Sequence, residues 1–197
     1  TNSDFDDVLI YNRELTPAEI RQIYGSIPTS GLVGHFPFNG NGEDASGNDN
    51  NGSVLAGVSN ATDRFGNANG ALRMDGTNTG YVTWNTGGNA AANSWFQGKT
   101  TVSVSAWVKP LVAEGANTKV FFEWSSGWFG LEGRTGAGQV VEYWTNQNTP
   151  SKLPFTLDVG RWNHVVVVLD GARKKIYKNG VKVGDIPYAV ALNGASH

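Results

Sequence analysis

The chain contains no cysteine and a single methionine among its 197 residues. Without cysteine there are no disulfide bonds, no thiol catalysis and no cysteine-bound zinc. Apolar stretches long enough to cross a bilayer are also missing, so we expect no membrane span. Lysine and arginine form no run and the formal net charge is −2, which argues against nucleic-acid binding.

Glycine and aromatic residues are abundant instead, with 26 Gly, 7 Trp, 9 Phe and 6 Tyr. Recurrent Asn-Gly and Gly-Asn pairs are typical of tight turns. Residues 101–108 alternate between polar and apolar, as a half-buried strand does. Asn179-Gly180 between two strand-like stretches predicts a hairpin. This composition favours a β-sandwich with short strands and many loops.

The first part of the chain predicts a strand that runs into a short helix. Val8 and Ile10 have the strand pattern. Thr16, Pro17 and Glu19 supply an N-cap, a proline at the first helical position and a capping-box acid.

Residues 5–20 (FDDVLIYNRELTPAEI) closely resemble the motif that closes LamG-like domains, the laminin G and pentraxin-like members of the concanavalin A-like class. Residues 36–52 (FPFNGNGEDASGNDNNG) resemble the motif that opens them. Further matching segments, at 63–76, 105–110 and 160–171, follow in the family's order. The resemblance implies an all-β fold, an antiparallel two-sheet jelly-roll sandwich with one short N-terminal helix.

The closing motif comes last in that family, whereas here it comes first. The resemblance divides the chain into a closing strand and helix at 1–25, a linker at 26–31 and a jelly-roll domain lacking its usual last strands at 32–197. Three arrangements of the closing motif remain open. It can close its own sheet as a permuted domain, finish a preceding repeat, or insert into a neighbouring copy.

Calcium is the cofactor that the resemblance implies. The first and last strands of the family are neighbours, so Asp6 and Asp7 would meet Asp44 and Asn48. Carboxylate and amide oxygens are Ca²⁺ ligands, and the ion would tie the ends of the domain together. The alternative is that Asp44 forms an Asx turn and the other acids only cap a strand.

Aromatic and polar residues cluster in the middle strands, where the class often binds glycans. Ring faces can stack on sugars and carboxamides can bind hydroxyl pairs. The candidate ligand-binding residues are Trp124, Trp128, Tyr143, Trp144 and Asn146. The alternative is that these tryptophans belong to the core.

The other tryptophans receive separate predictions. Trp107 and Trp162 match structural positions of the family and are expected in the core. Trp84 and Trp95 lie in a long Asn/Gly-rich stretch and are expected on a loop.

No catalytic motif is visible. Glucanases of this class need carboxylates spaced E-x-D-x-x-E on one strand, and that string is absent. Glu123 and Glu142 are single acids on separate strands, and the three histidines are scattered. We therefore expect no enzyme activity.

These observations predict a non-catalytic, secreted or cell-surface binding module, of bacterial origin, that adheres to a glycan or a surface protein and holds a structural calcium ion. The alternative is a subunit of a surface fibre or repeat array. Its neighbouring copies would join by β-strand complementation through residues 4–15.

Overall fold

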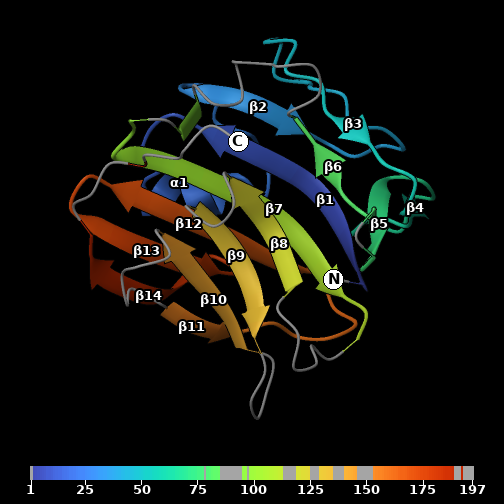
Figure 1. The fold of residues 1–197 in the computed structure, drawn as a ribbon. Helices are drawn as coiled ribbons and strands as arrows, with labels where there is room; N and C mark the ends of the chain where they lie inside the picture. The colour runs from blue at the N-terminus through green and yellow to red at the C-terminus, as the bar shows by residue number, and fades with distance from the viewer. Residues whose placement is uncertain are drawn as a thin grey trace.

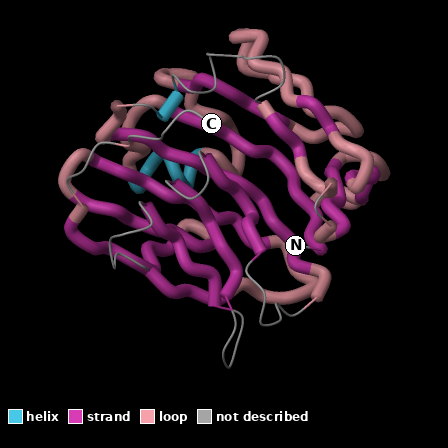
Figure 2. Tube along the Cα trace, viewed as in Figure 1, coloured by secondary structure: helices cyan, strands magenta, loops and turns pink. Residues whose placement is uncertain are grey.

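Alternating apolar patterns and frequent turn residues produce an almost entirely β structure in the computed structural model (Figure 2). The structure describes residues 2–77, 79–84, 95–96, 98–112, 119–124, 129–134, 140–145, 153–188 and 192, and gives only the backbone within 119–154. The strands are β1 (Asn2–Tyr11), β2 (Leu32–Phe36), β3 (Ser53–Val54), β4 (Val58–Ala61), β5 (Ala71–Asp75), β6 (Val82–Thr83), β7 (Thr101–Pro110), β8 (Lys119–Trp124), β9 (Phe129–Arg134), β10 (Val140–Thr145), β11 (Leu153–Thr156), β12 (Asn163–Asp170), β13 (Arg173–Lys178) and β14 (Val181–Pro187).

The described strands form two large antiparallel sheets and a small one, as the sandwich prediction requires. The larger sheet has eight strands in the order β14-β13-β12-β7-β1-β5-β4, with β2 also paired to β1. The second sheet has the order β11-β10-β9-β8, and β3 pairs with β6. Figure 1 shows the second sheet packed in front of the larger one.

Strand β1 lies in the middle of the larger sheet. One of its edges pairs with β7 along most of its length, from Ser3 to Tyr11. The other edge pairs first with β5, through residues 2–5, and then with β2, through residues 8–11. In this single chain the displaced strand therefore closes its own sheet, as in the first of the three arrangements above. The same contacts would form with a strand from an identical copy.

The inner face of the larger sheet forms the main core. Phe5, Val8 and Ile10 of β1 pack there with alternate residues of β7 and β12. Phe155 of β11 belongs to the same cluster, so the core lies between the two large sheets. Trp95 is 6% exposed in this core, and Trp84 packs against it and Phe36. Trp84 lies in the bend directly after β6, outside the strands as predicted, and both tryptophans contribute to the core from this stretch.

The outer face of the larger sheet carries a second, smaller core at one end. Helix α1 (Pro17–Gln22) covers it, behind the sheet in Figure 1. The cluster joins side chains of β1, the helix segment, β12 and β13: Leu9, Tyr11, Leu15, Ile20, Ile23, Val166, Val168 and Tyr177. The helix is too short to be stable alone, so this packing holds it.

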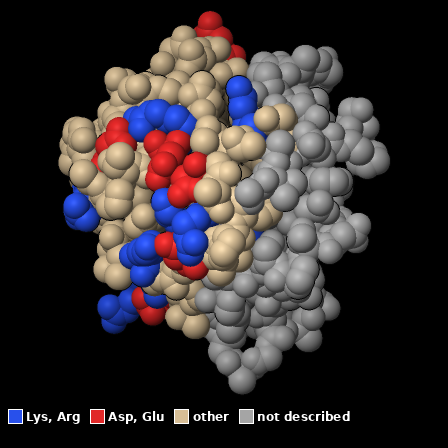
Figure 3. Space-filling view, turned by 90° about the vertical axis from the view of Figure 1, so that its left-hand side faces the viewer, with Lys and Arg blue, Asp and Glu red and all other residues tan. Residues whose placement is uncertain are grey.

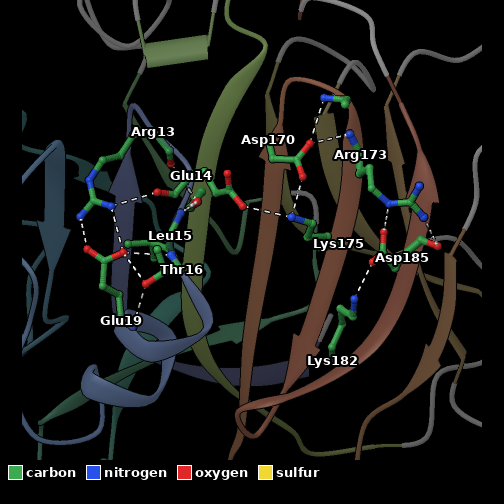
Figure 4. Close-up of polar contacts among 12 residues, drawn as sticks. Arg13, Glu14, Leu15, Thr16, Glu19, Asp170, Arg173, Lys175, Lys182 and Asp185 are labelled. Carbon is green, nitrogen blue, oxygen red and sulfur yellow. Dashed lines mark hydrogen bonds and ion pairs between the residues drawn. The ribbon is translucent and has the colours of Figure 1, made fainter.

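The start of α1 is fixed by the capping box that the sequence predicts. The Thr16 hydroxyl accepts from the Glu19 amide, and the Glu19 carboxylate accepts from the Thr16 amide. Arg13 pairs with Glu19 at 2.6 Å, and Ser103 of β7 accepts from the Leu15 amide at 2.9 Å. Figure 4 shows these contacts beside those that reach β13.

Acidic and basic side chains alternate over the described part of the face drawn in Figure 3. Glu14 and Asp170 both pair with Lys175, and Arg173 and Lys182 both pair with Asp185 (Figure 4). The described part of this surface is balanced in charge.

Substituting Ile10 by alanine tests the central position of β1. Ile10 is 1% exposed and sits opposite both Gly34 and Val104. We expect Ile10→Ala to lower the free energy of unfolding by about 2–5 kcal/mol, measured by urea titration. Val181→Ala at the 65%-exposed position of the edge strand is the control and should cost less than about 0.5 kcal/mol. Equal costs for the two variants would contradict the central role of β1.

Candidate functional site

The polar half of the outer face begins at Asp4, which is fully buried. Its carboxylate accepts from Nε of Arg73 at 2.7 Å and pairs with Nζ of Lys109 at 2.8 Å. These cations lie directly opposite Asp4 on β5 and β7. Ion pairs therefore fix the N-terminal end of β1 to both of its neighbouring strands.

The carboxylates of Asp6 and Asp7 converge on one group, although consecutive strand residues normally point to opposite faces. The register of β1 against β7 shifts between Asp6 and Leu9, and Asp7 has a φ of 45°. This β-bulge turns the second acid toward the first. Arg64 donates one Nη to Oδ2 of Asp6 and the other to Oδ2 of Asp7, each at 2.6 Å.

Aromatic rings surround the Arg64 guanidinium. Its central carbon lies 5.0 Å from the centroid of Trp107 and 4.3 Å from that of Phe65. Trp107 in turn stacks on His164, its cross-strand partner on β12, and Tyr24 meets both rings edge-on. This cation–π stack holds Arg64 over the sheet.

The predicted core positions of Trp107 and Trp162 need correction. Both residues are half-buried. Trp107 lies on the outer face, beneath Arg64, and the ammonium of Lys109 lies 5.1 Å from the ring centroid of Trp162. A side chain at an alternating strand position can face either side of a sheet, and here the outer side is polar.

Burial and hydrogen bonding act in opposite directions on the two acids. Burial raises the pKa of Asp6 to about 6, although Arg64 lowers it. Burial also raises the pKa of Asp7, but hydrogen bonds from His35 and Arg64 outweigh burial and hold that pKa below its ordinary value. The charged form of Asp7 is thus better stabilised than that of Asp6.

Asp44 organises the loop that follows β2. Its carboxylate accepts from the amides of His35, Ser46 and Asn50 at 2.8–3.0 Å and from the Ser46 hydroxyl at 2.8 Å. Burial raises the pKa of Asp44, but these donors outweigh it and lower the pKa overall. The Asn48 amide group donates to the carbonyl of Leu32 at 3.1 Å. The loop therefore has the Asx-turn geometry that was the alternative to a metal site.

His35 connects the two groups of predicted metal ligands. Its amide donates to Asp44, and its ring Nε2 lies 2.9 Å from Oδ1 of Asp7. The structure thus connects Asp6, Asp7 and Asp44 beside the bulge of β1, and Asn48 joins them through the Ser46 hydroxyl, which accepts from the Asn48 amide group and donates to Asp44. The groups that contact their carboxylates are the guanidinium of Arg64, the ring of His35, backbone amides and a hydroxyl.

This donor set does not fit a calcium ion well. Calcium takes six to eight oxygens, and both oxygens of Asp7 and of Asp44 already accept hydrogen bonds from the protein. Among the described residues, no three His, Cys, Asp or Glu side chains are grouped so that they could hold a metal. Calcium binding remains a prediction.

Sequence reasoning missed Arg64 and His35 as members of this site. Arg64 lies in the matching segment 63–76, and His35 directly precedes the opening motif. The signal in the sequence that could have identified them was the local charge balance. Three acids within residues 4–7 must become buried if β1 enters a sheet, and buried carboxylates need cationic partners.

A buried Ser–His pair lies beneath this site. The Ser105 hydroxyl is 2.8 Å from Nε2 of His164, and both residues are fully buried. Within the described part of the chain no group hydrogen-bonds to the other ring nitrogen of His164. Burial lowers the pKa of His164 to about 4, so the ring is neutral. A nucleophilic site needs an accessible serine and an acid that orients the histidine, and this pair has neither.

The predicted sugar-binding residues belong to the second sheet or to its connections. Trp128 and Asn146 lie outside the described residues, and Trp124, Tyr143 and Trp144 are described by their backbone positions. Cross-strand partners share a face of a sheet.

The register divides these three aromatic residues between two faces. Tyr143 pairs with Leu153, two residues before the core residue Phe155, so Tyr143 shares its face. Trp124 joins the same face, through Phe129 and Thr145. Trp144 pairs with Gly130 and falls on the opposite face, where Glu142 pairs with Glu132. Only that second face is turned away from the core.

Two packed antiparallel sheets define a β-sandwich of the lectin-like class, and comparison with known families agrees. The family model Laminin_G_3, described as the concanavalin A-like lectin/glucanases superfamily, matches residues 75–197, more than half of the chain. The chain therefore belongs to this superfamily.

Among solved structures, the chain is similar to domain 4 of AbnA, a GH43 extracellular arabinanase from Geobacillus stearothermophilus, in complex with arabinotriose. The identity is 16% and the TM-score 0.44, and the alignment covers 83% of this chain and 79% of that chain. No curated protein matches the sequence. No helix in the described residues is long and apolar enough to span a membrane.

The buried neutral His164 predicts acid sensitivity. Its pKa is about 4 in the folded chain and about 6.5 when unfolded, so between these values the unfolded state binds more protons. The stability that His164 contributes is complete above pH 6.5 and is lost as the pH falls toward 4, by about 3 kcal/mol.

The test compares urea unfolding of wild type and His164→Gln from pH 4 to 7. Glutamine can still hydrogen-bond to Ser105 but does not titrate. The raised pKa of Asp6 acts in the opposite direction but is common to both proteins, so it cancels in their difference. We expect the stability advantage of wild type to shrink by about 3 kcal/mol on acidification. A constant difference would show that His164 titrates normally.

Proposed function

We propose that this chain is an extracellular, non-catalytic carbohydrate-binding domain. The observation that carries the proposal is the family match over residues 75–197, which includes all four strands of the second sheet. The superfamily is named for lectins and glucanases, two classes that share carbohydrate as their ligand. At a cell surface, such a domain would attach its parent protein to glycans.

The proposed site is the face of the second sheet that carries Trp144. Glu142 lies two positions before Trp144 on β10 and pairs with Glu132 of β9. Glu123 of β8 pairs with Gly130, which is also the partner of Trp144. An aromatic ring stacks on the C–H face of a sugar, and carboxylates accept hydrogen bonds from its hydroxyls. The register supports this face because Trp144 and three acids share it.

Trp124 and Tyr143 take a different role in this proposal. They share a face with Phe155, which is 8% exposed in the main core. We therefore propose that both residues stabilise the sandwich and that Trp144 contacts the glycan. Of the three predicted sugar-binding residues that lie in described strands, Trp144 is thus the one proposed to contact the ligand.

Binding without hydrolysis is the version of the function that we favour. The Ser105–His164 pair is closed to substrate, as described above. Glu132 and Glu142 are direct cross-strand partners, and paired carboxylates are also the residues of a glycosidase. The experiment below therefore measures hydrolysis together with binding.

The binding test uses affinity electrophoresis in gels that contain β-glucan, xylan, arabinan or mannan. We expect at least one polysaccharide to retard the wild-type chain. Trp144→Ala should weaken that retardation about tenfold, since a stacked ring contributes roughly 0.5–1.5 kcal/mol beyond its buried area. Trp124→Ala should instead lower the free energy of unfolding by about 3–5 kcal/mol.

Phe65→Ala is the matched control, because it removes a 72%-exposed ring from the turn between β4 and β5, away from the second sheet. It should leave retardation unchanged. The proposal fails if the four polysaccharides leave the wild type unretarded, or if Trp144→Ala binds as well as wild type. Release of reducing sugar that Glu142→Gln abolishes would identify a hydrolase instead.

A further inference from the structure

We infer that Arg64 is the structural cation that joins the displaced N-terminal strand to the rest of this domain, in the place for which the family resemblance implies calcium. The inference concerns the outer face of the larger sheet and is independent of the proposed carbohydrate site. It assigns Asp6 and Asp7 as partners of a protein cation and not as metal ligands.

The first support is the geometry of the bulge. A regular strand would send the carboxylates of Asp6 and Asp7 to opposite faces, and neither a metal nor a guanidinium could then contact both. The bulge at Asp7 brings them together, and the two Nη atoms of Arg64 meet one oxygen of each at 2.6 Å. The fork of a guanidinium suits two separate carboxylates in this way.

The second support is that Arg64 is held in place from its own side. Its side chain is 14% exposed and lies over Trp107, with Phe65 beside it. The preceding residue, Asp63, accepts from the amides of Phe65 and Asn67, each at 2.8 Å, and so fixes the turn that carries Arg64. A cation fixed in this way loses little conformational freedom when it binds the two acids.

The third support is the connection to the opening loop. His35 lies between Asp7 and Asp44, at 2.9 Å from each. The closing strand, the turn at 63–67 and the opening loop are thus linked by an unbroken series of hydrogen bonds. A calcium ion predicted to tie the two ends together would duplicate a connection that the protein already makes.

Removing Arg64 should therefore destabilise the chain strongly. The buried carboxylate of Asp6 would remain without its cation, and the half-buried Asp7 would keep only His35. Breaking a buried ion pair from one side is far more costly than losing a surface pair. The proposed variant is Arg64→Gln, which keeps a hydrogen-bonding amide but removes the charge. The expected change is a fall of about 5–10 °C in the melting temperature. Arg64→Lys, which keeps the positive charge but not the two Nη groups, should lower the melting temperature less.

The control is Arg173→Gln, the same chemical change at an arginine that is 43% exposed and whose partner Asp185 keeps Lys182. Its melting temperature should change by less than about 2 °C. All variants and the wild type are melted in calcium chloride and in EDTA, and the wild type is titrated with calcium chloride by calorimetry.

The inference predicts that this cluster gives the wild type no calcium-dependent rise in melting temperature. It also predicts that Arg64→Gln melts at a lower temperature than the wild type. If Arg64→Gln does not fold, a lowered melting temperature of Arg64→Lys in EDTA gives the same support. A calcium-dependent rise in the wild type that Asp7→Asn abolishes would overturn the inference. So would an Arg64→Gln variant that melts like the wild type in EDTA.

Discussion

The structure depends on the pairing of β1 on both of its edges. A strand at the end of a sheet can be lost with one set of hydrogen bonds, but β1 separates β7 from β5 and β2. Without it, the larger sheet would divide into β14-β13-β12-β7, β5-β4 and a separate β2, with exposed backbone groups along the new edges. It also supplies Phe5, Val8 and Ile10 to the main core and Leu9 and Tyr11 to the smaller one. Its contribution to stability is therefore cooperative, since both cores and both halves of the sheet require it.

The bulge at Asp7 allows one strand to serve a polar and an apolar surface. Before it, Asp4 and Asp6 face outward and meet cations. After it, Leu9 and Tyr11 face outward and meet α1. A conformation with positive φ is costly for most residues but is tolerated by aspartate. The bulge thus turns both consecutive acids toward Arg64, and the apolar residues that follow it contact the helix segment.

Local features of this fold could be predicted from sequence, and the family resemblance predicted that the closing strand meets the opening loop, but the side-chain partners of the acids could not be predicted. The capping box at Thr16 and the hairpin turn at Asn179-Gly180 depend on neighbouring residues, and the structure has both. The partner of Asp6 and Asp7 lies 57–58 residues away, so spacing gave no indication of Arg64. The face on which Trp107 lies was equally hidden, because alternation fixes two faces but not which of them is the core.

The demands of β1 also explain why the two candidate sites belong to different sheets. The outer face of the larger sheet uses its buried acids for the cationic partners that β1 needs, so few of its carboxylate oxygens are free for a ligand. The second sheet has no displaced strand to fix, and its outward face combines Trp144 with acids that the register sets side by side. Like charges directly opposite one another destabilise a sheet unless something lies between them. In the proposed function, hydroxyl groups of a bound sugar would donate hydrogen bonds to Glu132 and Glu142 and so offset this repulsion.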